Sequence, residues 1–221
     1  MALVTGNTKF INQNPGSSAF STSHTHNVGD DGLLLVVMTM TSTVNFSNCT
    51  YGGVSMSLVS NALFSGLSQR QAVYSLSNPL TGGNTFTATF SGSQWSSMSF
   101  AILSFTGSSG IGNYLSTGGS STPHSETLTV SQNSLIYASG ISNNSQSFPY
   151  TIDGSNATNI FTHNTNKIVE GALPINNLNA GNIIIQTKTD FGNITNLSVE
   201  IMELGVTPPT TSPSSNWFLV L

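Results

Sequence analysis

The stretch Thr85-Phe86-Thr87-Ala88-Thr89-Phe90 alternates threonine with apolar residues. Successive side chains of a β-strand point to opposite faces of the sheet, so this period of two places Phe86, Ala88 and Phe90 on one face. Threonine suits the solvent face, because its branched side chain packs well on a pleated strand and carries no charge. The stretch therefore predicts a half-buried antiparallel strand and, with it, an all-β fold.

Other stretches extend this prediction along the chain. Residues 126–130 and 196–201 show the same alternation, which predicts two more half-buried strands. Residues 33–38 and 183–185 are apolar on both faces, as expected of strands that are covered on both sides. Residues 98–105 change phase part-way, which predicts either a β-bulge or burial on both faces.

Turn-forming residues separate these stretches and set the expected architecture. Clusters of Gly, Asn, Asp and Pro recur every 8–15 residues or so, a spacing typical of an antiparallel β-sandwich with about ten to twelve strands. No internal repeat is recognisable in the sequence. We therefore expect a single β-sandwich domain over residues 1–205, followed by a Pro/Ser/Thr-rich linker over residues 206–216 and an apolar C-terminal segment over residues 217–221.

The C-terminal segment differs in composition from the rest of the chain. Prolines in the linker favour an extended backbone. Burial of large apolar side chains stabilises a protein by about 1.5–3 kcal/mol each, so we expect the end of the tail to be covered. It is either a last strand on the domain's own sheet edge or an anchor that docks into a neighbouring subunit. The candidate anchoring residues are Trp217, Phe218, Leu219, Val220 and Leu221.

Low charge excludes several classes of function. Only 5% of the residues are charged, the formal net charge is −4, and the four cationic residues are scattered along the chain. Nucleic acids and anionic membranes both require clustered cations, so neither is an expected partner. The chain has one cysteine and no recognisable signal peptide, which together predict folding in a reducing cytoplasm.

Five segments of the sequence, taken in order, resemble a known module. They are residues 24–28 (HTHNV), 32–37 (GLLLVV), 49–56 (CTYGGVSM), 74–79 (YSLSNP) and 85–90 (TFTATF). This order resembles lectin-like jelly-roll β-sandwich modules of tailed-phage structural proteins and bacterial surface proteins. The resemblance covers roughly residues 20–204. It implies a jelly-roll sandwich, with Tyr51-Gly52-Gly53-Val54 as a tight turn, and it carries over no catalytic residue.

The resemblance, the absence of a recognisable signal peptide and the apolar tail together favour a function outside the cell that made the protein. We expect a non-enzymatic structural protein displayed on the exterior of a tailed-phage virion, as a capsid decoration or fibre-type protein made in the host cytoplasm. Its expected partners are other capsid or tail proteins and further copies of itself, trimers included. The alternative is a carbohydrate-binding or adhesion module for host glycans, for which Trp95 and Tyr114 are the candidate contacts.

Residues suited to catalysis or metal binding are few. His24 and His26 lie on one face of a predicted strand and Asp30 and Asp31 follow, but no further metal ligand is identifiable, so we expect no metal and no other cofactor. No nucleophile elbow is present. An acid/base pair for glycoside cleavage would have to come from Glu126, Asp153, Glu170, Asp190, Glu200 and Glu203. Glu200 and Glu203 are expected on opposite faces of one strand, and no catalytic residue is predicted.

Overall fold

The computed structural model shows an all-β protein with antiparallel sheets. It describes residues 2–13, 18–27, 32–40, 44–64, 69–92, 98–119, 124–142, 150–156, 158–162, 168–173, 179–187 and 194–205. None of these residues forms a helix with the length and apolar character needed to cross a bilayer. The predicted linker and apolar segment, residues 206–221, lie outside the described residues.

The N-terminal half forms two sheets that pack face to face. The inner N sheet has the strand order β1-β9-β3-β7-β6, and the outer N sheet has the order β2-β8-β4-β5. The strands are β1 (Val4–Gln13), β2 (Ala19–His26), β3 (Leu33–Met40), β4 (Phe46–Tyr51), β5 (Val54–Ser55), β6 (Ser57–Phe64), β7 (Gln69–Ser77), β8 (Gly82–Phe90) and β9 (Met98–Thr106).

The C-terminal half forms a second pair of sheets. The inner C sheet has the order β10-β18-β12-β16-β15, and the outer C sheet has the order β11-β17-β13-β14. The strands are β10 (Ser108–Gly119), β11 (Ser125–Val130), β12 (Leu135–Ser142), β13 (Tyr150–Ile152), β14 (Ser155–Asn156), β15 (Thr158–Thr162), β16 (Ile168–Leu173), β17 (Gly181–Thr187) and β18 (Ile194–Glu203).

The two halves have the same topology. Replacing each strand βn of the N-terminal half by βn+9 converts both of its strand orders into those of the C-terminal half. The chain is therefore a structural duplication, although no internal repeat is recognisable in its sequence. The described residues form strands β1 to β18 in two pairs of sheets, which is more than the ten to twelve strands that were expected.

Equivalent turns support the duplication residue by residue. Gly52 and Gly53 connect β4 to β5 with φ of 58° and 81°, and Asp153 and Gly154 connect β13 to β14 with φ of 48° and 76°. Two successive positive φ angles are typical of a type I′ hairpin turn, which glycine and aspartate tolerate. The turn predicted at residues 51–54 is thus confirmed, and it has a counterpart in the other half.

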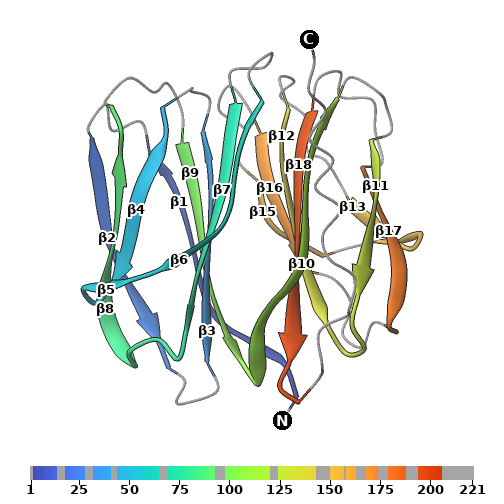
Figure 1. The fold of residues 1–221 in the computed structure, drawn as a ribbon, viewed down its shortest axis with the longest axis horizontal. Coiled ribbons are helices and arrows are strands. Elements are labelled where there is room, and N and C mark those ends of the chain that lie inside the picture. The colour runs from blue at the N-terminus through green and yellow to red at the C-terminus, as the bar shows by residue number, and fades with distance from the viewer. Residues whose placement is uncertain are drawn as a thin grey trace.

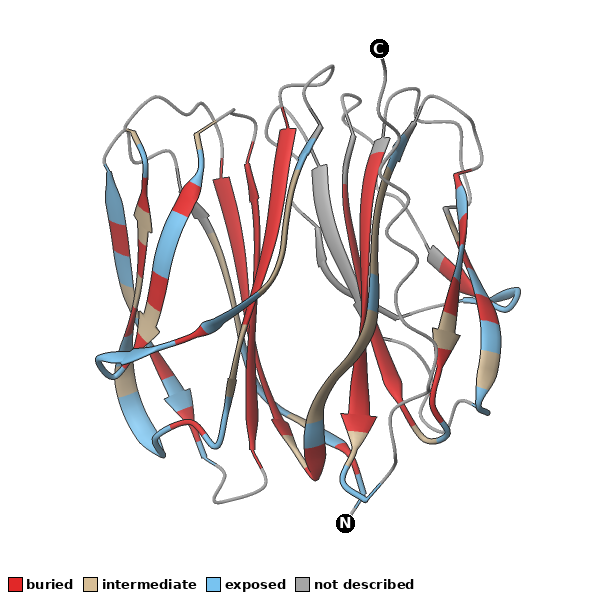
Figure 2. Cartoon of the chain, viewed as in Figure 1, coloured by how far each residue is buried: buried red, intermediate tan, exposed pale blue. Residues whose placement is uncertain are grey.

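The four sheets stack as layers, with the two inner sheets packed against each other (Figure 1). One apolar core lies inside each sandwich, and a third lies between the inner sheets. Strand β3 supplies Leu34 and Val36 to the N-terminal core and Leu35 and Val37 to the central core. Figure 2 shows the result as burial along β3 and β9 over nearly their whole length, with exposed residues on the outer sheets.

The layering accounts for the strand predictions. In β8, Phe86, Ala88 and Phe90 are buried and the threonines are exposed or half-buried, as predicted. Strand β3 is buried along its whole length, and β9 is buried on both faces up to Phe105, without a bulge in its ladder with β3. The prediction for residues 183–185 is wrong, because Ile184 is 50% exposed on the outer C sheet.

The described start and end of the chain lie at one pole of the stack. Val4 pairs with Thr106 at the end of β9, and Leu204 donates a backbone hydrogen bond to the carbonyl of Gly107. Figure 1 shows β18 pointing toward this pole, at which the N-terminus is also marked. The last described residues of the chain therefore lie beside the start of β1.

Candidate functional site

Of the residues predicted to contact a glycan or to anchor the tail, only Tyr114 lies in the described part of the chain. Trp95 and the anchor residues Trp217, Phe218, Leu219, Val220 and Leu221 lie outside that part of the chain. Tyr114 is described and lies on β10, an edge strand of the inner C sheet. The pairing of Trp95 with Tyr114 in a glycan site therefore stays a prediction.

Tyr114 lies directly after an irregularity in β10. The ladder between β10 and β18 shifts register between Ile111 and Tyr114, and Tyr114 then pairs with Val199. Its side chain is 38% exposed, which makes it the only aromatic among the large apolar side chains found exposed in the described ranges. An exposed ring on an edge strand has one face available for stacking against a partner.

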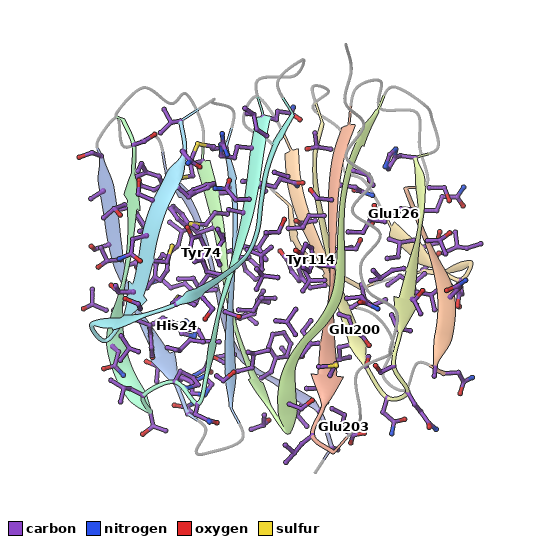
Figure 3. All side chains as sticks on the ribbon, in the orientation of Figure 1. His24, Tyr74, Tyr114, Glu126, Glu200 and Glu203 are labelled. Carbon is purple, nitrogen blue, oxygen red and sulfur yellow. The ribbon has the colours of Figure 1, made fainter. Side chains whose placement is uncertain are left out.

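The two histidines that were considered as metal ligands are buried in the N-terminal sandwich. His24 Nε2 is 2.9 Å from Ser104 Oγ on β9, and both ring nitrogens of His26 are buried without a hydrogen-bond partner among the described residues. Tyr51 Oη donates to the backbone carbonyls of His24 and Gly82, which fixes this end of β2 against β8. Figure 3 shows His24 within the N-terminal half.

Burial disfavours the protonated form of both imidazoles. Desolvation lowers the pKa of His24 to about 4, with smaller contributions from the charges of His26 and Lys9. Desolvation also lowers the pKa of His26. Within the described ranges no three His, Cys, Asp or Glu side chains are grouped as a metal would require. Asp30 and Asp31 lie outside these ranges.

Glu200 is a fully buried carboxylate that organises the C-terminal sandwich. Its Oε2 accepts a hydrogen bond of 2.8 Å from the backbone N–H of Asn113, and its Oε1 accepts from the backbone N–H of Ser131 and from Ser134 Oγ. A Cβ at Gly112 would overlap this carboxylate, so a larger residue there would displace Glu200 from its hydrogen bonds. One side chain thus ties the bulge to the turn between β11 and β12.

Glu126 is the second buried carboxylate, and it belongs to a network of hydroxyl groups. It accepts hydrogen bonds from Thr117 Oγ1, at 2.7 Å, and from Ser198 Oγ. His124 Nε2 lies 2.8 Å from the same Thr117 hydroxyl. Burial raises the pKa of Glu126, an effect that the two hydroxyl donors partly offset. Figure 3 shows Glu126 and Glu200 in the C-terminal half.

Both carboxylates were recognised in the sequence as titratable residues, but their burial was missed. The signal for Glu126 was its phase, since it shares one face of β11 with the buried residues Leu128 and Val130. No comparable signal exists for Glu200. Ser198 and Glu200 occupy the face of β18 that a half-buried strand would turn toward water, and here the outer C sheet covers that face.

Comparisons with family models, with curated proteins and with solved structures gave no match to this chain.

Proposed function

We propose that the chain is a non-enzymatic structural protein of a tailed-phage virion, displayed on the particle exterior as a capsid decoration or fibre-type protein. In this proposal the four-layered body projects from the particle, and the C-terminal tail or a sheet edge attaches it. The proposed partners are capsid or tail proteins and further copies of the chain.

The observation that carries this proposal is the pole at which the described body ends. Residue 205 lies at the pole where β1 begins, and the sequence continues from there with a proline-rich stretch and five apolar residues. Such an arrangement suits attachment at one end and display of the other. The almost uncharged surface also fits a particle exterior, since it offers few lysine and arginine sites for trypsin-like proteases.

The strand order supports the resemblance to jelly-roll modules. We infer that each half is a jelly roll. In the N-terminal half the strands β1-β9-β3-β7 face the strands β2-β8-β4-β5, and the C-terminal half repeats this arrangement with β10-β18-β12-β16 and β11-β17-β13-β14. Two facing sheets built from two Greek keys are typical of viral capsid and lectin domains. In this interpretation β6 and β15 are additional edge strands.

Deletion of residues 207–221 tests the anchor. The truncated protein is expected to keep the melting temperature of the full chain, because the three described cores are built from side chains between Leu3 and Ile201. It is also expected to be lost from purified virions when phage are grown with only this version. A matched control replaces residues 217–221 by serine at unchanged length and should be lost equally. Normal incorporation of either protein would show that the anchor proposal is wrong.

Glycan binding is the second candidate function, and the exposed ring of Tyr114 favours it. Tyr114→Ala is expected to weaken binding on a glycan array by about tenfold, since loss of a stacking contact costs roughly 1–1.5 kcal/mol. Stability should change by less than about 0.5 kcal/mol at this partly exposed position. An array on which the unmodified protein shows no saturable binding would exclude this function.

A further inference from the structure

The duplication allows the interior of one half to be compared with that of the other, position by position. The backbone N–H of Gly52 donates to the carbonyl of Thr85, and that of Asp153 donates to the carbonyl of Ile184. Thr85 and Ile184 are therefore equivalent. In the adjoining ladders Ser23 pairs with Thr85, and Thr127 pairs with Ile184. This sets the register between β2 and β11.

In that register two histidines correspond to two aliphatic residues. His24 is equivalent to Leu128 and His26 to Val130, and all four side chains are buried between an outer and an inner sheet. Because the C-terminal half closes with leucine and valine at these positions, the fold itself does not require imidazoles there. The pair is a specific addition to the N-terminal sandwich.

The surroundings of the pair make a positive charge costly. The His24–Ser104 hydrogen bond links the outer N sheet to the inner N sheet, and within the described part of the chain neither ring nitrogen of His26 has a partner. The charged groups that act on His24 are His26 on its own strand and Lys9 on β1, and both oppose its protonation. From β4 the phenol of Tyr51 packs edge-on against the ring of His24, at a centroid distance of 6.3 Å.

We propose that His24 and His26 form an acid-sensitive latch: when they become protonated, β2 separates from the inner N sheet while the C-terminal sandwich stays closed. Two adjacent imidazolium groups would repel each other and Lys9 in a site from which water is excluded. The pH dependence of the closed state follows from the linkage between proton binding and folding. Unfolded histidine binds its proton near pH 6.5 and native His24 only near pH 4, so the closed state loses stability as pH falls between these values.

The C-terminal sandwich responds differently because it contains a buried acid. Burial lowers the pKa of His124 and raises that of Glu126. Acidification therefore opposes burial of His124 but favours burial of Glu126 in its neutral form. The two effects offset each other within one network, whereas no described carboxylate is among the groups that act on His24.

Amide hydrogen exchange of the full-length protein at pH 7.5 and pH 4.5 tests the latch, after correction for intrinsic exchange rates. Amides of β2 and β8 are expected to exchange about 10- to 100-fold faster at pH 4.5, and those of β11 and β17 to change by less than threefold. The double variant His24→Leu/His26→Val installs the residues of the other half. It leaves Asp30 and Asp31 in place, and it should abolish the acid response of β2.

Either of two results would overturn the proposal. One is an equal loss of protection in β2 and β11, and the other is an unchanged acid response in the double variant. His24→Gln serves as a second variant in case the double variant fails to fold, since glutamine can still bond to Ser104. It should retain only the part of the response that His26 contributes, and a full response in this variant would also contradict the latch.

Discussion

Tyr137→Ala is expected to lower the free energy of unfolding by about 3–5 kcal/mol, the usual cost of removing a large aromatic ring from a packed core. Tyr137 on β12 is completely buried in the central core between the inner sheets. It packs there with residues of both halves, Leu35 and Val199 among them. The substitution should therefore destabilise the two sandwiches together, in a single transition under chemical denaturation.

Two control variants separate the effect of losing the buried ring from the effects of losing the hydroxyl group or a tyrosine on an edge strand. Tyr137→Phe keeps the ring and should cost less than about 1.5 kcal/mol. Tyr114→Ala removes the same side chain from an edge strand and should cost less than about 0.5 kcal/mol. If Tyr137→Ala produced two separate unfolding transitions, the central core would not join the halves as described. A loss similar to that of Tyr114→Ala would also contradict this role.

Glu200→Gln is expected to cost about 2–5 kcal/mol, although it changes a single atom of the side chain. Each oxygen of Glu200 accepts a hydrogen bond from a backbone N–H group, that of Asn113 or that of Ser131. A glutamine amide would direct its NH₂ group at one of these donors, whichever way it is turned. Gly112→Ala should have a similar effect, because the added Cβ would displace the carboxylate.

Glu126→Gln is the matched control, since it makes the same change at the other buried carboxylate. The donors to Glu126 are hydroxyl groups, and Thr117 can rotate to accept a hydrogen bond from an amide and donate one to His124. Because the pKa of Glu126 is raised by burial, the native protein loses stability as pH rises through that pKa. Glutamine avoids this loss.

Denaturant unfolding of both variants at pH 5 and pH 8 distinguishes the two carboxylates. Glu126→Gln should be within about 1 kcal/mol of the unmodified protein at pH 5 and gain relative to it at pH 8. Glu200→Gln should be less stable than the unmodified protein at both. If both variants lost the same free energy of unfolding, the backbone donors at Glu200 would not account for a difference between the two sites.

The fold class was predictable from local patterns, whereas the layering was not. Alternation in residues 85–90 and continuous apolarity in residues 33–38 report how each strand is covered, and both predictions are confirmed. The duplication left no visible trace, because topology requires burial and turn geometry rather than particular residues. Thus Gly52-Gly53 is matched by Asp153-Gly154, and His24 by Leu128.

The buried polar groups show where sequence patterns fail. The alternation in residues 196–201 is real, but a polar residue at every second position was interpreted as a solvent-facing surface. In the structure Ser198 and Glu200 are covered by a fourth layer, which no local pattern reports. Burial of a carboxylate is tolerated only where donors converge on it, and these donors come from segments distant in sequence. For the tail and Trp95, the sequence predictions stand untested.

The position of β18 determines how the body would respond to mechanical load. This strand lies between β10 and β12, pairs with both along most of its length, and leads directly into the tail. A pull on the tail would act along the strand, so that the hydrogen bonds of both ladders are sheared together rather than broken one after another. A body tethered in this way would withstand drag at its far end better than one that is tethered through an edge strand.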